Sequence, residues 1–102
     1  MCTNITIRTE LAGSAKGPQG WFRIDTAHVS FDHPFHAPFD HTLNIDLVNE
    51  RDPATPRVAV ELSPTAAFEL AANIIRALEQ GAVEAGIELA SPRAAAAAGG
   101  AN

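Results

Sequence analysis

All four histidines of the chain fall between positions 28 and 41, and three of them follow the spacing H-x2-H-x4-H. These three are His33, His36 and His41, and Pro34 and Pro38 stiffen the segment that carries them because proline fixes φ. Imidazole nitrogens are ligands for zinc, iron and copper, whereas calcium and magnesium prefer oxygen. The segment therefore predicts a transition-metal site, with zinc as the first expectation and iron or copper as the others.

Another interpretation is open, because this spacing matches no standard zinc motif such as H-E-x-x-H. The segment is then a proline-rich loop whose histidines are surface groups or pack against Phe35 and Phe39. The fourth histidine, His28, falls on the polar side of an alternating pattern, and we expect it to be solvated and not a ligand.

Three further residues could take part in chemistry beside the histidines. Cys2 is the only cysteine and offers a thiolate, either as a fourth metal ligand or as a nucleophile. Asp32 and Asp40 flank the histidines, and their carboxylates could accept the remaining ring N–H of a metal-bound imidazole. We therefore take Cys2 and Asp32 as the candidate catalytic residues, and an inert cysteine at a frayed terminus as the alternative.

Four segments alternate apolar and polar residues and predict half-buried strands, over residues 4–11, 21–32, 42–47 and 57–62. The alternation slips at Asp25–Thr26, where we expect a bulge or a bend. Residues 12–20 are rich in glycine and predict a flexible connection, and the prolines of residues 49–56 predict a turn. Nothing helical separates the strands, so an antiparallel meander is expected.

Ser63–Pro64 is typical of a helix start, with a capping hydroxyl followed by proline at the first position. Apolar residues then recur at helical spacing, and Gly81 predicts the C-terminal end of this helix. The expected fold class is α+β, a four-stranded antiparallel meander sheet with one C-terminal helix packed on one face. Residues 1–89 would form a single domain, and the Ala/Gly-rich residues 90–102 a disordered tail.

This meander has a consequence for the candidate site. In such a sheet the start of the first strand lies opposite the end of the second, which places Cys2 near Asp32 and His33. The connection between the second and third strands brings His41 beside His33. One end of the sheet is therefore expected to gather the thiol, the three imidazoles and the two aspartates.

Composition limits the classes of partner. The chain carries 7 Lys+Arg against 12 Asp+Glu, a formal net charge of −5, so it has no basic face for nucleic acid. Its apolar runs are too short to span a bilayer, and no signal peptide is recognisable. A single cysteine is typical of the reducing cytoplasm. A homodimer that buries Trp21 or extends the sheet is a further expectation.

The chain resembles a family of short bacterial proteins of unknown function. The resemblance rests on the Met-Cys-Thr start, on Gly20-Trp-Phe22, and on the segment from Phe31 to Asp46 with its His-Pro-x-His-Ala-Pro-x-x-His core. It covers about residues 1–80. Since that family has no named activity, the resemblance implies neither a reaction nor a substrate.

The sequence thus predicts a small cytosolic transition-metal-binding protein that acts as a metal-dependent enzyme on a small molecule. A metal-free catalyst that uses the Cys2 thiolate with a histidine base is the first alternative. A dimeric interaction module without enzymatic activity is the second.

Overall fold

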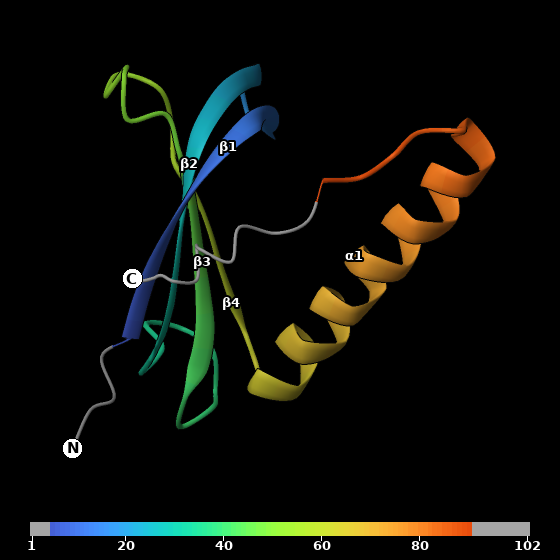
Figure 1. Ribbon diagram of the computed structural model, residues 1–102. Coiled ribbons are helices and arrows are strands. Elements are labelled where there is room, and N and C mark those ends of the chain that lie inside the picture. Colours follow the sequence, from blue (N-terminus) through green and yellow to red (C-terminus); the bar gives the residue numbers. More distant parts are fainter. Residues whose placement is uncertain (1–4, 91–102) are drawn as a thin grey trace. The chain divides into compact units, whose positions relative to one another are not determined.

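The computed structural model describes residues 5–90 of the 102-residue chain. It divides into two compact units at Phe68–Glu69, which we describe separately. The first contains a sheet with the strand order β1-β2-β3-β4, in which all neighbours are antiparallel (Figure 1). In the part of the chain that the structure describes, one helix, α1, follows the sheet. The predicted α+β class and the meander topology are therefore confirmed.

The first two strands form a long hairpin, with β1 at Ile5–Gly17 and β2 at Gly20–Asp32. The predicted flexible connection over residues 12–20 is therefore wrong, because only Pro18 and Gln19 form the turn. The positive φ of 114° at Gly20 explains why a glycine follows that turn. A Cβ on Gly17 would lie 3.3 Å from the Phe22 ring, so this glycine gives the aromatic ring room across the hairpin.

The irregularity expected at Asp25–Thr26 is present, but its extra residue lies in the other strand. Glu10 pairs with Thr26 and Gly13 pairs with Ile24, so β1 has one more residue than β2 between these two pairs. The bulge therefore belongs to β1, and the slip in the sequence of β2 marks the point opposite it.

The last two strands are β3 at Thr42–Val48 and β4 at Val58–Leu62. Apolar side chains from all four strands form one face of the sheet in two cross-strand rows, Ile5–Phe31–Leu43–Leu62 and Ile7–Val29–Ile45–Val60. The opposite face carries polar rows, Thr6–Ser30–Asn44–Glu61 and Arg8–His28–Asp46–Ala59. In the described residues the buried apolar side chains are Ile24 and Ala27, so the core is small.

The helix α1 runs over Pro64–Ala85. Ser63 caps it as predicted, since its Oγ accepts the N–H of Ala66 at 3.1 Å. The predicted end at Gly81 is wrong. The helix ends at Ala85, and Gly86 follows with a φ of 68°, the left-handed conformation that favours glycine.

Some expectations fall outside what the structure describes. The packing of α1 on the sheet and the single domain over residues 1–89 stay predictions. Cys2 and residues 91–102, which make up nearly all of the expected tail, lie outside the described residues. Within residues 5–90, no helix combines the length and the apolar character needed to cross a membrane.

Candidate functional site

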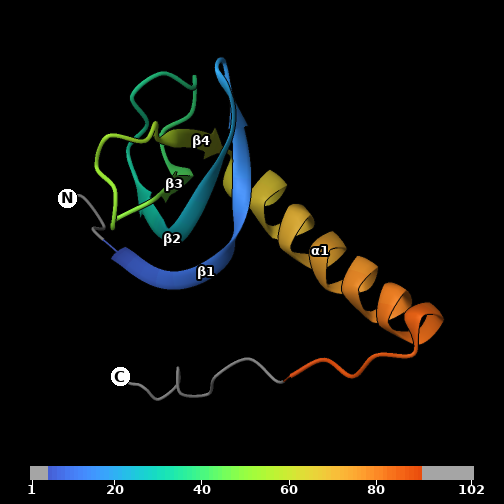
Figure 2. The same cartoon turned by 90° about the horizontal axis from the view of Figure 1, so that it is seen from above.

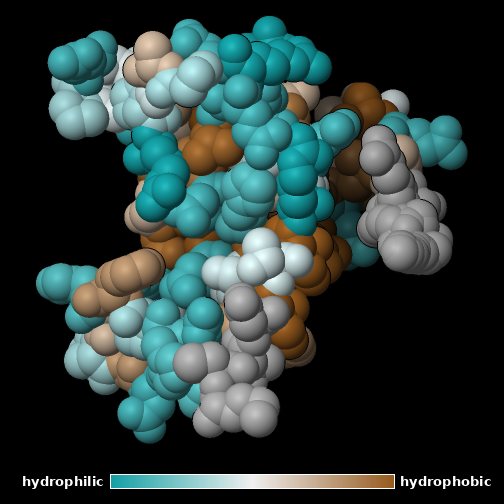
Figure 3. Space-filling view, turned by 90° about the vertical axis from the view of Figure 1, so that its left-hand side faces the viewer, coloured by the Kyte–Doolittle hydropathy of each residue, from teal (hydrophilic) through white to brown (hydrophobic). Residues whose placement is uncertain are grey.

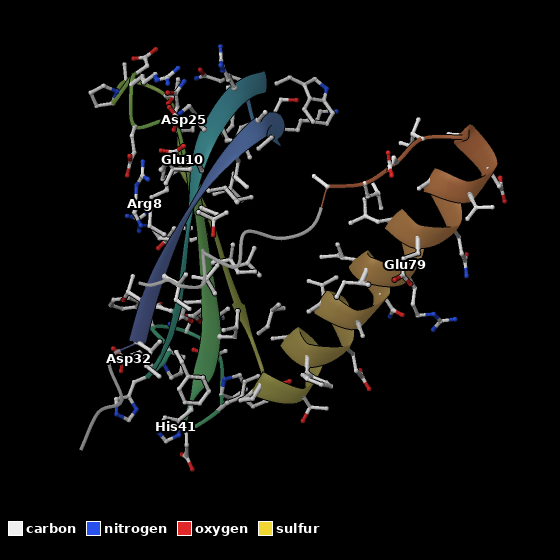
Figure 4. All side chains as sticks on the ribbon, in the orientation of Figure 1. Arg8, Glu10, Asp25, Asp32, His41 and Glu79 are labelled. Carbon is white, nitrogen blue, oxygen red and sulfur yellow. The ribbon has the colours of Figure 1, made fainter. Side chains whose placement is uncertain are left out.

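The histidine-rich loop, residues 33–41, joins the end of β2 to the start of β3. Asp32 and Thr42 are paired across the two strands, so the loop begins and ends at one end of the sheet. Figure 4 shows Asp32 and His41 together at this end, far from Arg8 and Asp25 at the other. The meander therefore brings together these parts of the predicted site as expected.

His33 is held at both its backbone and its ring. Its backbone N–H donates to Asp32 Oδ1 at 2.7 Å, and its ring Nδ1 lies 3.0 Å from the carbonyl oxygen of Asp40. A carbonyl oxygen can only accept, so the hydrogen bond assigns the proton of the neutral ring to Nδ1. The other ring nitrogen, Nε2, then carries a free lone pair, as a metal ligand requires.

His41 forms the second part of this arrangement. Its ring stacks on Phe31, with centroids 5.5 Å apart and planes inclined by 7°. It also stacks with the His33 ring, with centroids 5.1 Å apart and planes inclined by 27°. Two of the three predicted imidazole ligands are therefore neighbours, and the aromatic ring of a β-strand residue supports one of them.

The Glu61 carboxylate fixes the middle of the loop from β4. It accepts backbone N–H groups from Phe35 at 2.5 Å, from His36 at 3.0 Å and from Ala37 at 2.8 Å. The hydrogen bonds from Ala37 and Phe35 hold the pKa of Glu61 below its usual range. Sequence reasoning missed this residue, although its place on the polar side of the last strand was a usable signal.

The predicted ligand set is assembled only in part. Within residues 5–90, no group of three or more His, Cys, Asp or Glu side chains is arranged to hold a metal ion. His36 contributes its backbone N–H to Glu61, and no contact of its ring with His33 or His41 is present among the described stacking pairs. Cys2 lies outside the described residues.

The two aspartates differ from their expected roles in detail. We expected their carboxylates to accept a ring N–H. Instead, the acceptor for the His33 ring is the backbone carbonyl of Asp40, and the Asp32 carboxylate binds the backbone of His33. The Asp40 backbone carbonyl therefore takes the role that we expected of an aspartate carboxylate. It fixes the His33 ring without placing a charge beside it.

An open groove of about 530 Å³ lies on the polar face of the sheet next to His33. Asn44 is oriented in it, because its Oδ1 accepts the hydroxyl of the fully buried Thr42 at 2.7 Å, which leaves its amide N–H groups without a role in that bond. Arg57 lies 3.4 Å from Asp46. The groove offers both donors and acceptors, and its polar lining includes Ser30, Asp32, His33, Asn44, Asp46 and Glu61.

A second polar cluster lies at the other end of the same face. Arg8 Nη2 donates to Glu50 Oε1 at 2.7 Å, and His28 Nε2 lies 3.1 Å from Glu50 Oε2. The hydrogen bond to Arg8 is the main reason why the pKa of Glu50 is lowered. His28, which we expected to be solvated, therefore has an acidic partner. Figure 3 shows hydrophilic side chains gathered over the upper part of this side.

Asp25 ties this cluster to the turn before β4. Its Oδ1 accepts the backbone N–H of Glu50 at 2.8 Å, and this hydrogen bond lowers the pKa of Asp25. The cluster could not be found from sequence spacing, because Glu50 is 42 positions from Arg8 and belongs to a turn.

Comparison with known proteins places the chain in one family. No curated protein and no solved structure matches the chain. The model of a family of unknown function, DUF6295, matches residues 1–89, which include the whole sheet, the histidine-rich loop and α1. The chain belongs to this family of unknown function, DUF6295.

Proposed function

We propose that the protein binds a transition metal ion through His33 and His41, with Cys2 as a further ligand. The observation that carries the proposal is the hydrogen bond between His33 Nδ1 and the Asp40 carbonyl oxygen. It places the proton of the neutral ring on Nδ1, so that Nε2 carries the free lone pair, and it holds the ring in one orientation. Histidines that bind a metal through one ring nitrogen usually donate the N–H of the other nitrogen to such an acceptor.

The separation of the two imidazoles supports the same proposal. Two imidazoles on one tetrahedral metal, each with a metal–nitrogen bond of about 2.0–2.1 Å, have ring centroids roughly 5 Å apart. The centroids of His33 and His41 are 5.1 Å apart. The two rings are stacked with their planes inclined by 27°, so they must turn out of this stacking for both lone pairs to point toward one ion.

A thiolate from Cys2 would complete a site that favours zinc, iron or copper. Ile5 pairs with Phe31, the residue just before Asp32, so the chain enters the sheet at the histidine end. Covalent geometry limits the Cα of Cys2 to about 11 Å from the Cα of Ile5. His36, in the same loop, stays a proposed additional ligand.

The groove beside His33 supports a role on a small molecule. If His33 and His41 hold a zinc ion, the ion would supply Lewis-acid chemistry beside the groove. Asp32 and His33 line the groove, so a substrate held there would lie next to the metal ligands. We propose Asp32 and Cys2 as the catalytic residues, and a reducing cytoplasm, which keeps Cys2 a thiol, as the location.

The test is metal analysis of full-length protein purified without a histidine tag, followed by titration with Zn²⁺ and Co²⁺. We expect one equivalent of metal per chain. His33→Ala and His41→Ala should each weaken binding by about tenfold or more. His28→Ala is the matched control, since this histidine pairs with Glu50 at the other end, and it should leave the affinity unchanged.

Two further variants define the remaining ligands. Cys2→Ser should weaken binding and shift the Co²⁺ visible spectrum, because the thiolate-to-metal charge-transfer band is lost. His36→Ala tests whether the third imidazole joins the other two. Failure of the untagged protein to take up metal, or uptake that persists in both the His33 and the His41 variant, overturns the proposal.

A further inference from the structure

β1 is an outer strand of the sheet, and one of its two edges pairs with no strand of residues 5–90. The strand order is β1-β2-β3-β4, and Figure 2 shows β1 along the outside of the sheet. Within residues 5–90, β2 is its single strand partner. The free edge of β1 thus offers backbone N–H and C=O groups to another strand.

This edge lacks two of the features that prevent pairing. Proteins protect an outer strand by making it short, by placing proline or lysine on it, or by a β-bulge. β1 has 13 residues and no proline, although it carries Lys16 and the bulge between Glu10 and Gly13. The side chains of Ile5 and Ile7 are 50% and 59% exposed, so one side of this edge is apolar and accessible.

The charges along β1 are complementary to those of the same strand running in the opposite direction. When two copies of β1 pair antiparallel about Thr9, Arg8 of one copy lies opposite the partner's Glu10, and Glu10 lies opposite the partner's Arg8. Ile7 then lies opposite the partner's Leu11. Opposite charges, apolar side chains and threonines that face each other across strands all stabilise strand pairing, and the two copies of Thr9 form the central pair.

We infer that two copies of this chain form a dimer by pairing β1 with β1, antiparallel and centred on Thr9. Arg8 is able to take part, because its side chain is 47% exposed although it binds Glu50. Its own Glu10 lies 3.5 Å away, so Arg8 exchanges a weak contact for the partner's Glu10. This inference does not depend on metal binding, since the paired residues lie apart from His33 and His41.

The first test is a disulfide that forms only in this register. In a Cys2→Ser background, Thr9→Cys should cross-link two copies under mild oxidation, because paired Cα atoms across antiparallel strands lie within disulfide range. Thr6→Cys is the control. Its Cα would lie roughly 20 Å from its counterpart in the partner, so it should stay reduced.

The second test uses charge reversal, read by sedimentation equilibrium of the full chain. Glu10→Arg, which leaves the Arg8–Glu50 pair intact, should raise the dimer dissociation constant by about tenfold, since two symmetric pairs become repulsive. Arg8→Glu should act likewise, and the double variant should recover most of the affinity. Circular dichroism of each variant reports whether the sheet is still folded.

Several outcomes overturn the inference. One is a monomer at millimolar concentration. Another is equal cross-linking of Thr9→Cys and Thr6→Cys. A dimer whose dissociation constant does not change on charge reversal also overturns the inference, because such a dimer would use another surface, such as the one around Trp21.

Discussion

Glu61, on the last strand, accepts the backbone N–H of Ala37, in the histidine-rich loop, at 2.8 Å. Two more N–H groups of the same loop reach the same carboxylate, from Phe35 and His36. A charged acceptor forms stronger hydrogen bonds than a neutral one. One side chain therefore orders the loop between two metal-ligand candidates that it does not itself contact.

We predict that Glu61→Gln loosens this loop without unfolding the sheet. The neutral amide has one acceptor oxygen where the carboxylate has two, so the N–H groups of Phe35, His36 and Ala37 lose their charged partner. Their hydrogen exchange should become about tenfold faster, as measured by NMR. Glu84→Gln on α1 is the control, and unchanged exchange at Ala37 in Glu61→Gln would contradict the prediction.

Acid should weaken the fold through Glu50. Its pKa in the folded protein lies below the usual value of 4.5 because Arg8 and His28 bind the carboxylate. The stabilisation is therefore present above pH 4.5, and it is lost as the pH falls through the lower folded pKa. Asp25, whose pKa is also lowered, adds to the same loss.

Urea unfolding between pH 7 and pH 3 measures this dependence. The midpoint for the natural chain should be nearly constant down to about pH 5 and then fall. Glu50→Gln should lower the midpoint at pH 7 and reduce the drop in acid, because the titrating group is absent. Parallel curves for both proteins would refute the role of Glu50.

Two glycines near the end of α1 should respond in opposite directions to alanine. Gly86 has a φ of 68°, so Gly86→Ala forces an unfavourable backbone and should destabilise the helix end by about 1 kcal/mol. Gly81 lies inside the helix with open space at its Cβ position, so Gly81→Ala should stabilise it by roughly 0.5–1 kcal/mol. Thermal melting followed by circular dichroism of the helix compares the two variants. Equal changes in stability for Gly86→Ala and Gly81→Ala would contradict the prediction.

Thr42→Val should destabilise the protein, although valine and threonine have nearly the same shape. Thr42 is fully buried and its hydroxyl donates to Asn44 Oδ1 at 2.7 Å, so valine leaves a polar amide oxygen without this partner. We expect a loss of about 1–3 kcal/mol in unfolding free energy. Thr55→Val is the comparison, because the half-buried Thr55 hydroxyl donates to the Asp52 carbonyl oxygen at 2.7 Å in a turn that water can reach. It should cost less, and equal costs would count against the role of the buried Thr42 hydroxyl.

The strand order was predictable because the hydrophobic alternation has a period of two and no helix separates the strands. The hairpin was predicted too short, because glycines such as Gly13 and Gly17 are typical of loops. In the structure Gly13 lies at the bulge and Gly17 makes room for the Phe22 ring. Local propensity was overridden by cross-strand packing, which a single sequence does not display.

The candidate site shows the same limit. The meander was sufficient to place His33 beside His41, since both residues flank one connection. It did not reveal which atom of Asp40 contacts His33, because a backbone carbonyl carries no sequence signal. The Glu50 cluster was missed for a related reason, since its members come from a turn and two strands and none of them is spaced as a motif.

The shortness of β4 has a consequence for assembly. If two sheets join through β1, the outermost strands of the combined sheet are the two copies of β4, each only five residues long. Pro56 precedes this strand and Pro64 follows it, and neither has an N–H to offer an incoming chain. The combined sheet should therefore stop growing at two subunits, and the short, proline-flanked β4 strands should resist fibril formation.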